Sequence, residues 1–373
     1  EKKRTAKAPH SDYIEYCVTD SYLYSLSSIG GHSQFVQLGR KSTFDSLLVK
    51  FNSYVELKNL NTNDTILRQL DKILIEPVSE VLPDRIVLIP EGDIGLVPFE
   101  MLKNACGNYR IEESAISYMY QYEPYMYENL KGTKKSAIFC LAPNYGTKSG
   151  EDPEVSRGLL YSLPYAKNEI DSIYRLFGWG SRRSESGDKK EWLKNIRATK
   201  IFHYAGHAVV RKDQAYLALS NSIDKPSQLT DSEIGQLHNP LDMVVLSACE
   251  TGLGKFESGE GIRSLGRSFM EAGAAASIYS LWSINDRSTA SFMSSFYKYL
   301  QKGMRKDEAL RQCKLDFILH SSKFRHPYYW AAFIGAGDME PLEIKNKRLM
   351  IIGGLCIFMM LLIAFALYFS KNK

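Results

Sequence analysis

The chain has 373 residues, of which 44% are hydrophobic and 24% charged, a composition typical of a globular protein rather than a disordered one. Its formal net charge of +5 is small for this length, so nucleic acid is not expected as a partner. The six cysteines are scattered without CxxC spacing, which argues against a disulfide framework or a zinc ribbon and favours a reducing compartment. No metal or other cofactor is expected. The chain starts at Glu1 without a methionine or an apolar leader, so we expect a fragment of a longer protein.

The first third of the chain changes from strand-like to helical patterns. Three short β-like runs with polar or glycine turns between them predict an antiparallel meander; they lie at 13–19, 22–28 and 34–38. Apolar residues at helical spacing between 42 and 81 then predict two helices. The run at 85–90, which is apolar after Arg85, predicts the first buried strand.

From residue 137 onward, apolar strands alternate with helical patterns. The expected strands are 137–142, 200–204, 242–247, 275–281 and 329–334. The expected helices are 165–177, 261–272, 288–302 and 306–319. Strands and helices that alternate at this spacing predict a mostly parallel sheet with helices on both faces.

A run without any charged residue extends from Leu349 to Phe369. At about 1.5 Å per residue, a helix of this length can cross a bilayer core of about 30 Å. The run therefore predicts a transmembrane helix, with a buried core helix as the alternative. More basic residues precede it than follow it, which favours a cytoplasmic position for the large domain.

Two of the apolar strands end beside residues with nucleophilic or basic chemistry. His207 follows the run from Ile201, and Cys249 follows the run from Met243. In an open parallel sheet, ligands and catalytic groups gather at the carboxyl ends of the strands. A cysteine attacks as its thiolate and needs a nearby base, so the pair predicts a nucleophile with its base. Taken singly, each residue also fits a structural role, Cys249 as a buried strand cysteine and His207 as a hydrogen-bonded polar group.

Small residues stand beside both members of the pair. Gly206 precedes His207, and Ala248 precedes Cys249, so a substrate backbone could approach both closely. The backbone N–H groups of Gly206 and Cys249 are then candidates for an oxyanion hole.

Several ordered motifs resemble the CHAT family, caspase-like domains that are related to separase and are often preceded by tetratricopeptide repeats. The motifs are HYAGHA at 203–208, LSACETG at 246–252, GEG at 259–261, LWSIND at 281–286 and HPYYWAAF at 326–333. Further matches are LIPEG at 88–92, VPFE at 97–100 and LPYAKNE at 163–169. The resemblance covers roughly residues 13–338.

The resemblance implies an α/β, caspase-like three-layer fold with a mostly parallel central sheet and an N-terminal α+β subdomain, to which the uncharged run adds one C-terminal transmembrane helix. The expected divisions are an N-terminal part at 1–130, a catalytic unit at 131–340, a basic linker at 341–348, the transmembrane helix at 349–369 and a short tail at 370–373.

The resemblance also implies a cysteine endopeptidase that acts on protein substrates. His207 matches the family's catalytic histidine and Cys249 its nucleophile, while His203 matches a recurrent histidine with a supporting role. The expected partners are a protein substrate, the membrane and upstream tetratricopeptide repeats. The alternative is a non-catalytic caspase-fold scaffold or signalling adaptor at the membrane.

Asp286 is the candidate specificity residue. In separases an aspartate of the matching Leu-Trp motif lines the pocket for a basic P1 side chain, and a carboxylate there would select Arg or Lys by charge pairing. Asp286 equally suits the N-cap of the helix expected from residue 288, because aspartate is favoured at that position.

Three other chemistries are disfavoured. His203 and His207 have the spacing of helical metal ligands, but their run is strand-like and lacks the glutamate of HExxH. The segment 251–255 lacks the GxxxxGK[ST] spacing of a phosphate-binding loop. Acidic residues interrupt the basic segment at 182–190, which indicates a solvated loop rather than a nucleic-acid patch.

Overall fold

The computed structural model describes residues 12–57, 64–120, 136–145, 163–178, 180–211, 214–219, 227–249, 265–282, 284–321 and 324–343. The chain separates into two compact units, Glu1–Pro341 and Leu342–Lys373. Almost all of the second unit, including the predicted membrane segment at 349–369, lies outside the described residues. Among the helices that are described, none is both long enough and apolar enough to cross a bilayer.

The first unit is built around a mixed β-sheet. In chain order its strands are β1 (Tyr13–Val18), β2 (Tyr22–Ile29), β3 (His32–Arg40), β4 (Arg85–Ile89), β5 (Ala115–Tyr118), β6 (Ser136–Leu141), β7 (Arg182–Ser184), β8 (Thr199–Arg211), β9 (Gln214–Ala218), β10 (Gln228–Thr230), β11 (Met243–Cys249), β12 (Ala276–Ser280) and β13 (Phe333–Gly337). Their spatial order is β10-β9-β8-β11-β12-β13-β5-β4-β1-β2-β3, and β6 pairs with β8 and β7.

The helices connect these strands. They are α1 (Lys41–Leu57), α2 (Thr65–Leu74), α3 (Arg110–Glu113), α4 (Pro164–Phe177), α5 (Lys189–Ile196), α6 (Asp231–Gly235), α7 (Leu265–Glu271), α8 (Asp286–Gln301), α9 (Lys306–His320) and α10 (Pro327–Trp330), with 3₁₀ turns η1 (Gly92–Leu96) and η2 (Phe99–Met101). The chain therefore has a mixed α/β fold with a largely parallel central sheet.

The strands of the N-terminal half of the first unit (β1 to β5) include the predicted meander, which is confirmed. Strands β1, β2 and β3 pair antiparallel, and β1 then pairs parallel with β4. Ile14, Leu23 and Leu88 from three of these strands are fully buried, so one face of this half forms a core. The helices predicted between 42 and 81 are α1 and α2.

Parallel pairing dominates the C-terminal half, where β6, β8, β11 and β12 lie side by side. This confirms the parallel sheet predicted from the alternation of strands and helices. The predicted strand at 200–204 was too short, however, because β8 continues to Arg211. Its residues 208–211 leave the parallel ladder and pair antiparallel with β9, whose Ala215 and Leu217 are buried.

The strand predicted at 329–334 was wrong in its first half. Pro327 occupies the first turn of α10, and the His326 side chain caps that turn by accepting a hydrogen bond from the Tyr328 N–H at 3.1 Å. Proline at the first helical position and a side-chain cap both favour a helical turn. Strand β13 consequently begins at Phe333, and it runs antiparallel to β12.

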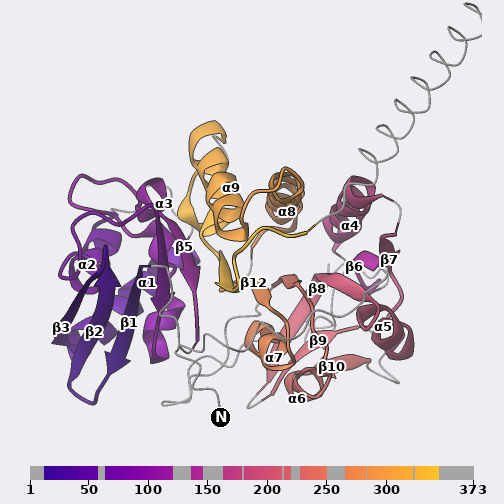
Figure 1. Cartoon of the computed structure of the whole chain (residues 1–373), viewed down its shortest axis with the longest axis horizontal. Helices are drawn as coiled ribbons and strands as arrows, with labels where there is room; N and C mark the ends of the chain where they lie inside the picture. Colours follow the sequence, from indigo (N-terminus) through magenta and orange to yellow (C-terminus); the bar gives the residue numbers. More distant parts are fainter. Residues whose placement is uncertain are drawn as a thin grey trace, which may run out of the picture. The chain divides into compact units, whose positions relative to one another are not determined.

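Helices cover both faces of the C-terminal half of the sheet (Figure 1). Helices α4, α8 and α9 lie on one side, and α5, α6 and α7 lie on the other. Neighbouring residues of β8 show the alternation of side chains. Phe202 packs against Trp192 of α5 and Phe269 of α7, whereas the His203 ring meets Tyr297 of α8.

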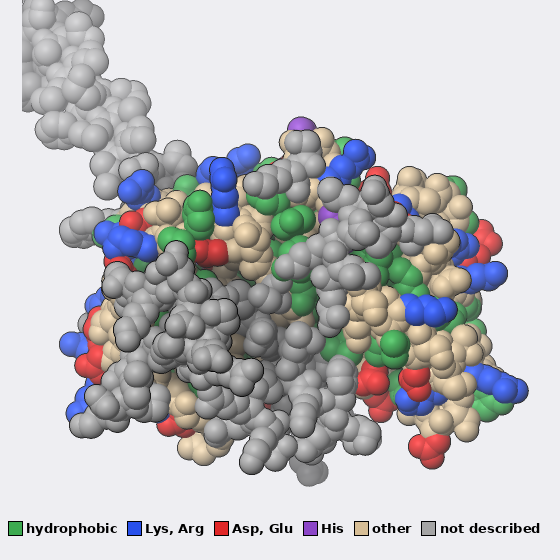
Figure 2. Space-filling view, turned by 180° about the vertical axis from the view of Figure 1, so that it is seen from behind, with side chains coloured by type: hydrophobic (Ala, Val, Ile, Leu, Met, Phe, Trp, Pro, Cys, Tyr) green, Lys and Arg blue, Asp and Glu red, His purple; other side chains and the backbone are tan. Residues whose placement is uncertain are grey.

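Charge is dispersed on the surface. Figure 2 shows Lys and Arg side chains interspersed with Asp and Glu among the described residues of one face. This distribution accords with the small net charge of the chain.

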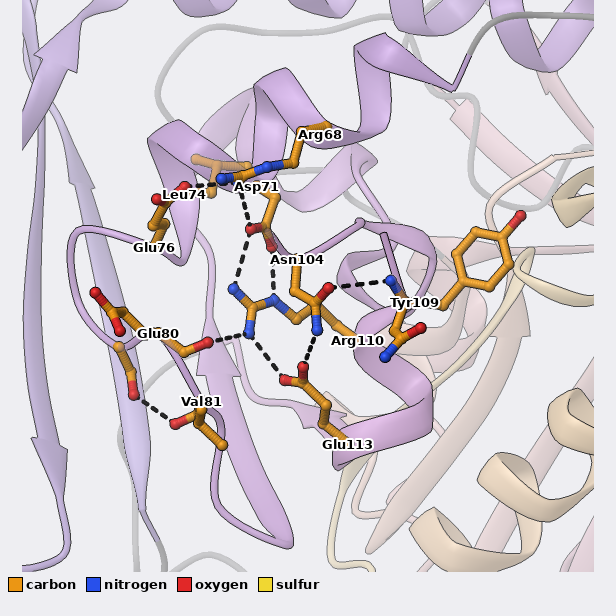
Figure 3. Close-up of polar contacts among 12 residues, drawn as sticks. Arg68, Asp71, Leu74, Glu76, Glu80, Val81, Asn104, Tyr109, Arg110 and Glu113 are labelled. Atoms are coloured by element: carbon orange, nitrogen blue, oxygen red, sulfur yellow. Dashed lines mark hydrogen bonds and ion pairs between the residues drawn. The ribbon is translucent and has the colours of Figure 1, made fainter. Parts of the chain in front are cut away.

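A buried guanidinium stabilises the N-terminal half (Figure 3). Arg110 is 1% exposed, and its Nε and Nη2 donate to the two carboxylate oxygens of Asp71 at 2.7 and 3.0 Å. Its Nη1 donates to the Glu80 carbonyl and to Glu113, both at 2.8 Å. Burial raises the pKa of Asp71, and pairing with Arg110 opposes that shift. Because the guanidinium is planar and rigid, one side chain fixes α2, α3 and the segment before β4 relative to one another.

A second buried ion pair connects the two halves of the unit. Lys314 of α9 donates to Glu100 of η2 at 2.7 Å, and both side chains are buried. The Tyr118 hydroxyl at the end of β5 donates to the other Glu100 oxygen at 2.5 Å and accepts from the Phe99 N–H. Burial lowers the pKa of Lys314, and the Glu100 carboxylate opposes that shift. These contacts hold helix α9 against β5 and η2.

Replacing Arg110 by alanine would leave the Asp71 carboxylate buried without its bidentate partner. We expect Arg110→Ala to lower the free energy of unfolding by about 3–5 kcal/mol, measured by urea denaturation. The control is Lys41→Ala, which removes the partly exposed pair with Asp45 and should cost less than about 1 kcal/mol. Equal losses in the two variants would contradict the role of Arg110.

Candidate active site

Strands β8 and β11 bring His207 and Cys249 together. Their parallel register pairs the Cα atoms from Ile201 with Met243 through to His207 with Cys249, which is the last pair of the ladder. Adjacent strands lie about 4.8 Å apart, so the two backbones are direct neighbours. For Cys249 the structure describes the backbone, and the residues that follow it, including the GEG motif at 259–261, lie outside the described part of the chain.

The position of His207 differs in one respect from the prediction. It was expected where its strand ends, but β8 continues past it. His207 instead marks the point where β8 exchanges β11 for β9 as its partner, since Ala208 already pairs with Leu217.

Two tyrosine hydroxyls hold the backbone of His207. The His207 N–H donates to the Tyr145 hydroxyl at 3.0 Å, and the Tyr204 hydroxyl donates to the His207 carbonyl at 2.8 Å. The Tyr145 ring also meets the imidazole edge-on, with centroids 4.8 Å apart. Burial raises the pKa of Tyr204 well above its ordinary value, so its hydroxyl stays protonated and able to donate. Sequence analysis missed Tyr145; its signal was a polar-ended residue just beyond the carboxyl end of β6.

These two tyrosines explain why residue 206 is a glycine. A Cβ atom at this position would lie 2.5 Å from the Tyr204 hydroxyl and 2.6 Å from the Tyr145 hydroxyl. The prediction assigned the glycine to the close approach of a substrate. The structure gives it an internal cause, because the two hydroxyls occupy the space that a side chain would need.

His203 lies in a buried chain of hydrogen bonds. It is fully buried, and its Nε2 lies 2.9 Å from Oε1 of Glu169 on α4, while its Nδ1 lies 3.1 Å from the Tyr297 hydroxyl on α8. A carboxylate oxygen only accepts, so Nε2 donates to Glu169, and in the neutral ring Nδ1 accepts from the Tyr297 hydroxyl. His203 therefore orients a carboxylate.

A pocket adjoins the His207–Cys249 pair. It is small, with about 20 Å³ of free space inside, and it opens to solvent. Ala205, Ser247 and Ser280 line it from the carboxyl ends of β8, β11 and β12, and Glu169 and Asp286 line it from helices α4 and α8. Gly206 and Ala248, which directly precede the pair, also face this space. An acidic pocket therefore lies next to the candidate nucleophile and base.

Asp286 is not the N-cap of α8. That position belongs to Asn285, whose side chain accepts from the Ser288 N–H at 3.4 Å. Asp286 is the first residue of the helix, and its Oδ2 accepts from the Tyr165 N–H at 2.8 Å. Its carboxylate thus lies near the positive N-termini of two helices. Burial raises its pKa, the Tyr165 N–H lowers it, and the nearby Glu169 raises it again.

The comparison with known families agrees with the motifs. The model of the CHAT domain matches residues 64–338, which is more than half of the chain. The chain belongs to the CHAT domain family.

The curated relatives of this CHAT domain are much longer proteins. Tetratricopeptide repeat protein 28 of Homo sapiens is 23% identical over 309 residues, and its Mus musculus counterpart is 22% identical over 306. Each alignment covers 70% of this chain and 12% of the relative. The chain therefore spans about an eighth of the length of the curated relatives it matches.

Solved structures resemble the CHAT domain in fold. The complex of Porphyromonas gingivalis RgpB pro- and mature domains has a TM-score of 0.50 at 12% identity, covering 77% of this chain and 72% of that one. A separase–securin complex of Saccharomyces cerevisiae has a TM-score of 0.45 at 13% identity, covering 68% of this chain and 15% of that one.

The packing at Gly206 gives a stability test. Gly206→Ala should destabilise the domain by about 1–3 kcal/mol, because the new methyl group must displace the Tyr145 and Tyr204 hydroxyls. In a background of Tyr145→Phe and Tyr204→Phe the same substitution should cost less, since the two clashing oxygens are gone and only the ring carbon Cζ of residue 204, 2.6 Å from the new Cβ, still clashes. Urea denaturation of the matched pairs measures both costs, and equal costs would refute the explanation.

Proposed function

We propose that this CHAT domain is a cysteine endopeptidase with Cys249 as its nucleophile and His207 as its general base. The observation that carries the proposal is the terminal pairing of these two residues in the β8–β11 ladder. A second support is the acidic pocket that adjoins the pair. A third is the family, whose resemblance implies these roles for the two residues.

The reaction is acyl transfer to the cysteine. His207 accepts the thiol proton, and the thiolate adds to the carbonyl carbon of the scissile peptide bond. The tetrahedral intermediate collapses when the imidazolium gives its proton to the leaving amine, which leaves a thioester. Water, deprotonated by His207, then attacks the thioester; the acid product leaves and the thiol is restored.

Backbone groups stabilise the intermediate in this proposal. The N–H groups of Gly206 and Cys249 donate to the oxyanion that forms on the substrate carbonyl. The hydrogen bonds that His207 donates to Tyr145 and accepts from Tyr204 hold its backbone in place. A base whose backbone is fixed loses less entropy when the reacting groups align.

The pocket sets the substrate class. Asp286 would pair with the charged end of an Arg or Lys side chain at P1, so cleavage follows a basic residue. The Tyr165 N–H fixes one oxygen of Asp286, which leaves the other for the substrate.

The nucleophile can be tested directly. Cys249→Ala should abolish cleavage of reporter peptides after Arg or Lys and leave the unfolding midpoint unchanged. The control is Cys17→Ala, which removes an exposed free cysteine of β1 and should retain activity. Unchanged turnover in Cys249→Ala would refute the assignment.

A scaffold role is the competing function, and labelling separates the two. A peptide that ends in Arg and carries a thiol-reactive electrophile should modify Cys249 selectively in the peptidase. A scaffold would show no selective modification at that cysteine.

We further propose that the segment at 349–369 anchors the domain on the cytoplasmic side of a membrane, because the segment is uncharged and long enough to span a bilayer. Tetratricopeptide repeats would precede the domain in the full-length protein, as the names of its curated relatives suggest. The whole chain should then stay with membranes during alkaline carbonate extraction, and a chain ending at residue 341 should be released. Release of both would contradict the anchor.

A further inference from the structure

Glu169 lies in the acidic pocket without a role in the proposed reaction. It is 1% exposed and lines the pocket together with Asp286. Its Oε1 accepts from His203, and no hydrogen bond to its Oε2 is present among the described residues. Oε2 is therefore open to a donor that enters the pocket.

A second polar group in this pocket also lacks a partner. Ser247 of β11 is 6% exposed, and its Oγ has no hydrogen-bond partner in the described part of the chain. It lines the same space as Glu169 and Asp286. By contrast, the neighbouring Ser280 hydroxyl donates to the Ala248 carbonyl at 2.7 Å. The Ser247 hydroxyl is therefore available to a group that enters the pocket.

We propose that Glu169 is a second specificity-determining carboxylate of this pocket, and that Glu169, Asp286 and Ser247 together accept hydrogen bonds from a guanidinium group. The inference rests on the proposed function only in treating this pocket as the P1 site. A guanidinium carries five N–H donors in one plane, so it can satisfy acceptors that reach it from two helices and a strand.

His203 acts in this arrangement as a positioning residue. Tyr297 bonds Nδ1 of His203, and Nε2 of His203 holds one oxygen of Glu169, which leaves the other oxygen for the pocket that Glu169 lines. The three residues come from α8, β8 and α4, and all three are buried. The orientation of Glu169 thus depends on the docking of both helices on the sheet.

Binding in the absence of catalysis tests the role of Glu169. The probe is N-acetyl-arginine amide, titrated calorimetrically into the Cys249→Ala protein. Glu169→Gln keeps an oxygen for His203 but removes the charge, and should weaken binding about 10-fold or more, as expected for the loss of one charge-assisted hydrogen bond. Ser247→Ala should weaken it less. The matched control is Glu271→Gln on α7, an exposed carboxylate that should leave the affinity unchanged.

An uncharged probe adds a second control. N-acetyl-citrulline amide has nearly the shape of the arginine probe without its charge, so Glu169→Gln should not reduce its binding. Unchanged arginine affinity in Glu169→Gln, or no binding of the arginine probe by the Cys249→Ala protein, would overturn the inference. A protein that binds the probe as expected but cleaves no peptide after Arg or Lys would instead refute the proposed function.

Two substitutions of His203 test its positioning role. The amide nitrogen of His203→Gln can reach Glu169 in place of Nε2, whereas His203→Asn can replace only Nδ1 toward Tyr297. We expect the arginine affinity to be largely retained in His203→Gln and lost in His203→Asn, with unfolding midpoints measured alongside. An equal loss of affinity in both variants would overturn the positioning role.

Discussion

The register between β8 and β11 is the constraint on which the candidate site depends. Side chains alternate between the faces of a sheet, so a slip of one residue would send every side chain of one strand to the opposite face. Two neighbouring residues of β8 oppose such a slip, because their partners lie on opposite faces. His203 bonds Glu169 and Tyr297 on one face, whereas Phe202 packs against aromatic rings of α5 and α7 on the other. Contacts in the middle of β8 therefore help to set which chemical groups meet at the end of the ladder.

Helix α8 contributes both a residue that lines the pocket and a residue that supports it. Its first residue, Asp286, lines the pocket, and Tyr297, further along the same helix, holds His203 beneath it. Helix α9 packs beside α8 and carries Lys314, whose buried partner Glu100 belongs to the N-terminal half. The buried Lys314–Glu100 pair thus joins α9 to the N-terminal half, and α9 in turn packs against α8, which lines the pocket. The N-terminal half therefore supports the pocket indirectly.

Apolar runs and motif residues predicted much of this arrangement. The buried strands and the meeting of His207 with Cys249 follow from local patterns, because a parallel sheet collects its strand ends at one edge. The hydroxyls of Tyr145 and Tyr204, the partner change of β8 and the pairing of His203 with Glu169 could not be predicted, since each joins residues that only the tertiary fold brings together. The cap of α8 was assigned to Asp286 rather than Asn285 because both residue types are favoured at that position, and a shift of one residue decides between them.

The position of β5 beside β13 has a consequence for synthesis of the chain on the ribosome. Tyr118 pairs with Ala336, and Arg311 donates to the carbonyl of Ile111, 200 residues earlier. At a synthesis rate of about 5–20 residues per second, the ribosome needs roughly 10 to 40 seconds to add 200 residues. The N-terminal strands therefore wait that long for their partners. During that time β5 presents an open sheet edge, the kind of surface on which nascent chains aggregate. Of the described strands, the last to leave the ribosome is thus β13, which joins β12 to β5 in the middle of the sheet.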